Sequence, residues 1–108
     1  MLVPNEERTL LAALALQRLG FDRFHGYKLA SQLRTMHPST RAMSYSTLYR
    51  CLDRLAERGL VDEVEANPET SARGPKRREF ALAELGEKKA TELAAAAGED
   101  SELFWNLA

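Results

Sequence analysis

The stretch that decides the fold runs from residue 44 to residue 60 and reads SYSTLYRCLDRLAERGL. At about 100° per residue, its apolar residues fall on one stripe and most of its charged residues fall opposite. We therefore predict an amphipathic helix from about Ser46 to Arg58, with Ser44 or Ser46 as its cap and Gly59 at its end. The stripe expected to face a core consists of Leu48, Cys51, Leu52 and Leu55.

The outer face of this helix has two interpretations. Arg50 and Arg54 could contact DNA phosphates or guanine edges, because arginine forms paired hydrogen bonds with guanine. Alternatively, they form a solvated face beside Asp53 and Glu57. Because these two carboxylates would repel phosphate, we expect them to orient arginines.

Hydroxyl groups border the same face. Ser46 and Thr47 could bind a phosphate through hydroxyl and backbone N–H groups, or they could serve only to cap the helix. Tyr49 lies at the edge of the apolar stripe, so its ring is expected to pack while its hydroxyl reaches a phosphate, with pure packing as the alternative. Tyr27, at the start of the preceding helix, could likewise reach the DNA backbone.

Two helices are expected before this one. The first runs from Asn5 to Leu19, with Asn5 as its cap. Its leucines, including Leu10 and Leu14, spread over more than one face, so we expect a partner subunit to cover part of it. The second helix runs from about Tyr27 to Met36, since apolar residues recur there at helical spacing.

Beyond Gly59 the pattern changes to that of strands. Residues 60–66 and 78–82 carry alternating apolar residues, and the turn formers of NPETSARGPKR join them in a long hairpin. A helix from about Glu84 to Ala97 follows. This order of elements is that of a winged helix, a mainly α fold with a small antiparallel hairpin. In such a fold a helix enters the major groove and the hairpin reaches the sugar-phosphate backbone.

The C-terminal residues predict an interface. Leu93 on the last helix and the tail that ends the chain carry apolar side chains that would be a liability if exposed on so small a protein. We expect them to contact a second copy, and folding back onto the same subunit is the alternative. The tail residues concerned are Leu103, Phe104 and Trp105.

Local charge supports nucleic-acid binding although the total does not. The formal net charge of the 108 residues is -1, so any binding must depend on clusters. The hairpin holds the densest cluster, which we expect to contact phosphates and make binding steeply dependent on salt; a solvated hairpin tip is the alternative. The cluster consists of Arg73, Lys76, Arg77 and Arg78.

Other classes of protein are disfavoured. With Cys51 as the only cysteine, an internal disulfide is excluded, and its place on the apolar stripe favours a buried thiol over a redox sensor. His25 and His37 are the only histidines, so we expect His25 to hydrogen-bond at a helix start and no metal to be bound. The sequence contains no catalytic triad and no phosphate-binding loop, so we do not expect an enzyme. It also contains no apolar run long enough to span a membrane.

Three segments carry a resemblance to a known family. HGYKLASQL at 25–33, STLYRCLDRLAERGLV at 46–61 and RREFALAELGEKKATEL at 77–93 resemble the PadR family of bacterial transcriptional regulators. The resemblance implies a winged-helix homodimer in the bacterial cytoplasm, associated with the nucleoid, that binds palindromic operator DNA and usually represses. It further implies dimerisation through the C-terminal helix and, in several members, a small-molecule effector near the dimer interface.

The chain departs from the family at two positions. Arg50 stands where the family commonly has proline after the Leu-Tyr pair, and Ala83 replaces the threonine that usually caps the last helix. We accordingly expect a DNA-binding winged-helix domain over 1–83 and a dimerisation segment over 84–108. The alternative function is a winged-helix module that binds a protein partner through the tail and the first helix, without DNA.

Overall fold

The computed structural model describes residues 2–38, 42–64 and 78–96. The predicted site residues on the hairpin tip and in the tail lie outside these ranges: Arg73, Lys76, Arg77, Leu103, Phe104 and Trp105. The described elements are α1 (Pro4–Arg18), β1 (Phe24–His25), α2 (Gly26–Met36), α3 (Tyr45–Glu57), β2 (Val61–Val64), β3 (Glu79–Leu82) and α5 (Glu84–Ala96). This order confirms the predicted winged helix.

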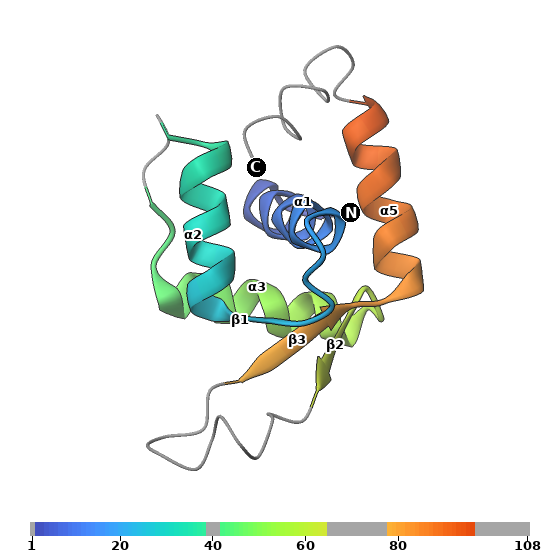
Figure 1. Cartoon of the computed structure of the whole chain (residues 1–108). Coiled ribbons are helices and arrows are strands. Elements are labelled where there is room, and N and C mark those ends of the chain that lie inside the picture. The colour runs from blue at the N-terminus through green and yellow to red at the C-terminus, as the bar shows by residue number, and fades with distance from the viewer. Residues whose placement is uncertain (1, 39–41, 65–77, 97–108) are drawn as a thin grey trace.

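Helix α1 forms the centre of the fold. Figure 1 shows α2 and α5 on opposite sides of α1, with α3 crossing below it, and α1 contacts all three helices. Every residue from Thr9 to Leu16 is buried. Leu10 and Leu14 therefore lie in the subunit's own core, which corrects their assignment to a subunit interface: the other faces of α1 are covered by α2, α3 and α5.

The helix starts differ slightly from the predicted ones. Helix α1 begins at Pro4, not Asn5, and the backbone N–H of Val3 donates to Glu6 Oε1 at a distance of 3.5 Å. Proline suits this position because the N–H that it lacks would have no helical partner. Helix α2 begins one residue early, and His25 Nδ1 accepts from the Lys28 N–H at 3.3 Å, which confirms the hydrogen-bonding role predicted for His25.

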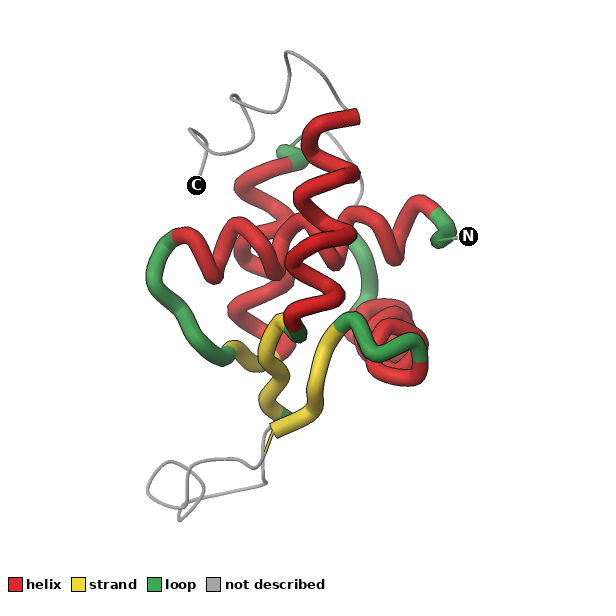
Figure 2. Tube along the Cα trace, turned by 90° about the vertical axis from the view of Figure 1, so that its right-hand side faces the viewer, coloured by secondary structure: helices red, strands yellow, loops and turns green. Residues whose placement is uncertain are grey.

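A three-stranded antiparallel sheet completes the fold, with strand order β1-β3-β2. Phe24 of β1 pairs with Phe80 of β3, and Val61 of β2 pairs with Leu82. Figure 2 shows the strands at one end of the helical body. Strand β1 was not predicted, because two residues are too few to show alternation.

Gly86 allows the first turn of α5 to lie close to Leu60, the residue directly before β2. The Leu60 carbonyl oxygen accepts a hydrogen bond from the Ala83 N–H at 3.1 Å. A Cβ atom added at Gly86 would lie 1.8 Å from that oxygen. The glycine that interrupts an otherwise strong helix-forming sequence thus allows backbone to approach backbone.

Candidate nucleic-acid interface

The N-terminal turn of α3 is held by its own side chains. Ser44 caps the helix: its Oγ accepts from the Thr47 N–H at 3.1 Å and lies 3.0 Å from the Thr47 hydroxyl. Ser44 rather than Ser46 is therefore the cap. The Thr47 N–H is occupied by the cap, while the side chain of Ser46 is exposed beside it.

Arg50 lies on the exposed face of α3, opposite the buried stripe. Within the described ranges it makes no ion pair or hydrogen bond through its side chain. A guanidinium in this state retains all its donors for a ligand. Arg50, which stands where the resembled family commonly has proline, is therefore available to a ligand, and its contact with DNA stays a prediction.

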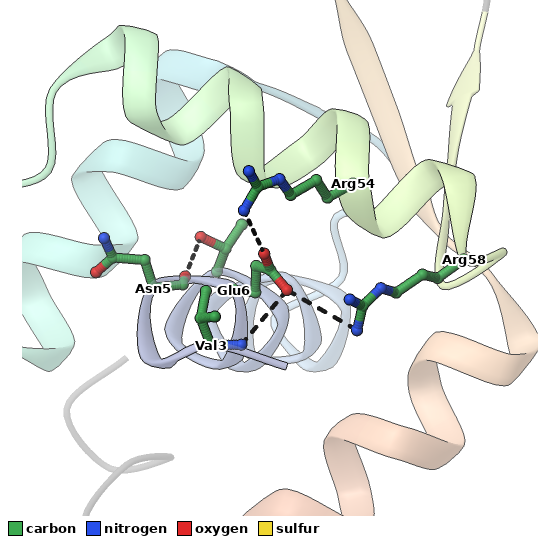
Figure 3. Close-up of polar contacts among 6 residues, drawn as sticks. Val3, Asn5, Glu6, Arg54 and Arg58 are labelled. Atoms are coloured by element: carbon green, nitrogen blue, oxygen red, sulfur yellow. Dashed lines mark hydrogen bonds and ion pairs between the residues drawn. The ribbon is translucent and has the colours of Figure 1, made fainter. Parts of the chain in front are cut away.

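Arg54 turns toward α1, where the carboxylate of Glu6 receives it (Figure 3). Glu6 is 1% exposed, and its Oε2 lies 3.3 Å from Arg54 Nη1, while Arg58 Nη1 lies 4.0 Å from its Oε1. The Arg54 side chain keeps 53% of its surface exposed. The guanidinium of Arg54 therefore links α3 to α1, because a buried carboxylate requires a charged partner. The DNA contact expected of Arg54 from the sequence stays a prediction.

Replacing Arg54 by alanine should destabilise the fold. Breaking a fully buried ion pair costs about 3–5 kcal/mol, and because Arg54 is half exposed and Arg58 remains nearby, we expect about 1–3 kcal/mol. Urea unfolding followed by circular dichroism would measure the loss.

A double variant that removes both charges of the ion pair provides the control for this prediction. In the double variant Glu6→Gln with Arg54→Ala, no buried charge lacks a partner, so part of the stability should return. Glu7→Gln, on the same turn of α1, should leave stability nearly unchanged. Equal losses in the Arg54 single variant and the Glu7 variant would contradict the proposed tie.

Arg78 joins the hairpin to α3. Its Nη2 lies 2.6 Å from Asp53 Oδ1 and 2.7 Å from Glu63 Oε1, and its Nε donates to Glu63 Oε2 at 3.1 Å. The guanidinium also lies 5.5 Å from the ring centre of Tyr49 and 5.2 Å from that of Phe80. The bond from Arg78 lowers the pKa of Glu63, and the bonds to Glu63 and then Asp53 raise the pKa of Arg78.

This arrangement shows what Asp53 does. The prediction that Asp53 orients an arginine is confirmed, and the arginine is Arg78, which directly precedes β3. Asp53 and Glu63 already balance the charge of Arg78, and the guanidinium thereby links α3 to β2. The phosphate contact expected of Arg78 from the sequence stays a prediction.

Tyr49 and Tyr27 have different environments. Tyr49 is half buried, and a Cβ atom added at Gly26 would lie 2.5 Å from its hydroxyl oxygen. Its ring therefore packs against the start of α2 and against Phe80, with 6.4 Å between the ring centres. Tyr27 is 59% exposed at the start of α2, so its hydroxyl is accessible to a DNA backbone.

Cys51 is a buried thiol, as predicted. Burial and, second, the charge of Glu6 raise its pKa, so the thiol stays protonated at neutral pH. Among the described residues, no group of three or more His, Cys, Asp or Glu side chains could hold a metal. In the same residues, no helix combines the length and apolarity needed to cross a membrane.

Sequence reasoning missed the residues that hold α3 in place. In the sequence, Glu6 is recognisable only as an acidic residue that suits the start of a helix. No local pattern indicates that it pairs with Arg54, which lies 48 residues away. The glycines at positions 26 and 86 gave a local signal of a different kind, since a glycine in a helix often marks a place where another segment approaches closely. The structure brings Ser46, Thr47, Arg50 and Tyr49 together on α3 but directs Arg54 and Arg78 to carboxylates.

Two solved structures are similar to this one, and one family model matches the sequence. The solved structure of the circadian clock associated protein Pex from Anabaena is 25% identical, with a TM-score of 0.59, and the match covers 84% of this chain and 75% of that one. A transcriptional regulator from Clostridium thermocellum, Cth-833, is 14% identical with a TM-score of 0.61 over 95% of this chain and 94% of that one, which establishes likeness of fold alone. None of the curated protein sequences matches the chain. The model of the PadR-like family matches residues 15–92, and the chain therefore belongs to this family of transcriptional regulators.

Proposed function

We propose that the protein binds operator DNA as a homodimer and acts as a repressor, with α3 as the recognition helix. The observation that carries this proposal is the exposed, unbalanced guanidinium of Arg50 on α3, beside the hydroxyl of Ser46. Carboxylates hold the neighbouring arginines, so α3 has a fixed orientation and one arginine directed outward. A helix presented in this way can place a guanidinium against a guanine edge in the major groove.

The remaining contacts are assigned by position. Ser46 and Thr47 would approach a phosphate at the start of α3, and Tyr27 would do so at the start of α2. The basic residues of the hairpin that lie outside the described ranges would contact the backbone beside the groove: Arg73, Lys76 and Arg77. Arg54 and Arg78 would act by positioning α3 and the hairpin.

Dimerisation is assigned to residues 84–108, and DNA binding to residues 1–83. Leu85 of α5 is 57% exposed and Leu93 is half buried, so α5 retains an apolar surface for a partner. A two-fold dimer would place two copies of α3 about one DNA turn apart. We further propose that the protein binds a small-molecule effector and lies in the bacterial cytoplasm, associated with the nucleoid. We also propose that it has no catalytic activity.

The rival function, a protein-binding module without DNA, has less support. It used the first helix as a docking surface, and the central residues of α1, from Thr9 to Leu16, are buried. Without that surface, only the tail would remain for a partner.

Selection of bound fragments from a random DNA pool tests the proposal. We expect a palindrome whose half-sites are separated by about one helical turn, or 10–10.5 base pairs. Enrichment of a single non-palindromic site would contradict the dimer. No enrichment at 50 mM salt, a condition that favours electrostatic binding, would contradict DNA binding itself.

Arg77→Gln and Arg78→Gln should differ in the salt dependence of operator binding. Arg77→Gln should lower the slope of log affinity against log salt by about 0.9, the value for one phosphate contact. Arg78→Gln should weaken binding with a smaller change in slope, because Asp53 and Glu63 already balance its charge. Fluorescence anisotropy at four salt concentrations would measure both slopes, and equal changes would assign Arg78 to a phosphate after all.

A further inference from the structure

A cavity of about 370 Å³ lies beside the start of α3. Its walls come from the first half of α1, the second half of α2 and the residues that lead into α3. Its volume falls in the range of pockets that hold small organic ligands, about 300–1,000 Å³. None of the described residues of α5 lines the cavity.

Some of the residues that line the cavity are aliphatic. They include Ala30 and Leu33 of α2, together with Met43 and Leu48. Among its described lining residues only His37 has an aromatic ring, and no Phe, Tyr or Trp offers a larger surface for stacking. This surface matches a flexible hydrocarbon chain.

The lining is also cationic. Arg8 and Arg34 belong to it, and no described lining residue is a carboxylate. Neither arginine forms an ion pair with a described residue, whereas Arg54 and Arg78 are paired with carboxylates. Burial and, second, the charge of Arg8 lower the pKa of His37, which also lines the cavity, so His37 is neutral at pH 7 and the positive charge comes from the two arginines.

The cavity also borders the cap of α3. Ser44, whose Oγ accepts the Thr47 N–H, lines it together with Thr47. A molecule in the cavity would therefore contact the turn that fixes the N-terminal end of α3. Because Ser46 and Arg50 follow directly on this helix, a shift of the capping turn would move them.

We infer that this cavity binds an aliphatic monocarboxylate, with its carboxylate at Arg8 and Arg34 and its chain against Leu33, Met43 and Leu48. Two guanidinium groups offer charge-assisted hydrogen bonds, which are about twice as strong as neutral ones. Occupancy alters the capping turn of α3 and thereby operator affinity; this regulatory part rests on the proposed function.

Calorimetric titration with octanoate tests the site without DNA. Octanoate should bind, and octanamide, which has the same chain and no charge, should bind at least about tenfold more weakly. The double variant Arg8→Gln, Arg34→Gln should lose octanoate binding by a similar factor. Lys88→Gln, which removes an exposed positive charge outside the cavity, should bind octanoate like the original chain, and circular dichroism would verify that each variant is folded.

Three results would overturn the site: no octanoate binding, equal binding of octanoate and octanamide, or inorganic phosphate binding as tightly as octanoate. The last result would make the cavity a simple anion site that suits DNA phosphate. Because this titration contains no DNA, its outcome is independent of whether the protein binds an operator. Octanoate that binds but leaves operator affinity unchanged would overturn the regulatory part alone.

Discussion

Replacing Gly86 by alanine is expected to destabilise the protein by at least about 3 kcal/mol, although helix propensity alone would favour alanine by about 1 kcal/mol. The added Cβ would lie 1.8 Å from the carbonyl oxygen of Leu60, and this atom belongs to the backbone, which cannot rotate away. Helix α5 would have to move off the start of β2, and the hydrogen bond from Ala83 to Leu60 would be lost. Urea unfolding would measure the change.

Lys88→Ala is the matched control for the glycine variant, because Lys88 is exposed on the same helix. It should change stability by no more than about 0.5 kcal/mol. A Gly86→Ala variant as stable as the original chain would show that α5 does not approach Leu60 as closely as described. The opposite signs of the propensity and contact effects make this test decisive.

Replacing Arg50 by alanine is expected to weaken operator binding about 10- to 100-fold and to relax sequence preference at one base pair in each half-site. A paired hydrogen bond from arginine to guanine contributes about 1–3 kcal/mol of discrimination. Loss of stability should be small, since Arg50 is exposed and forms no ion pair with a described residue. Anisotropy titrations with the selected operator, and with operators changed at single positions, would measure affinity and preference.

Two controls separate recognition from charge. Lys88→Ala removes the same charge from α5 and should weaken binding much less. Arg50→Lys keeps the charge but loses the planar fork of donors, so it should retain phosphate-type affinity while losing base preference. If Arg50→Ala weakens binding to every sequence equally, Arg50 contacts phosphate and the specificity of α3 lies elsewhere.

The sequence was sufficient to predict the helices, because their apolar stripes and end signals are local. The amphipathic pattern of residues 46–58 predicted α3 within one residue at each end. The partners of Arg54 and Arg78 were not predictable, because each pair joins elements that are distant in the chain. The apolar residues around α1, including Leu10 and Leu14, indicated that other elements cover more than one face of this helix. The pattern of apolar residues does not show whether those elements belong to the same subunit or to a partner.

The contact between Gly26 and Tyr49 has a consequence for how this sequence can change. Any side chain at position 26 would overlap the phenol ring at position 49, where the added Cβ would come within 2.5 Å of the hydroxyl oxygen. Unless the Tyr49 ring shifts, a change at position 26 therefore requires a change at position 49. Relatives that carry a larger residue at the first position are expected to carry a smaller one at the second, and a library that randomises both should recover folded proteins mainly from such compensated pairs.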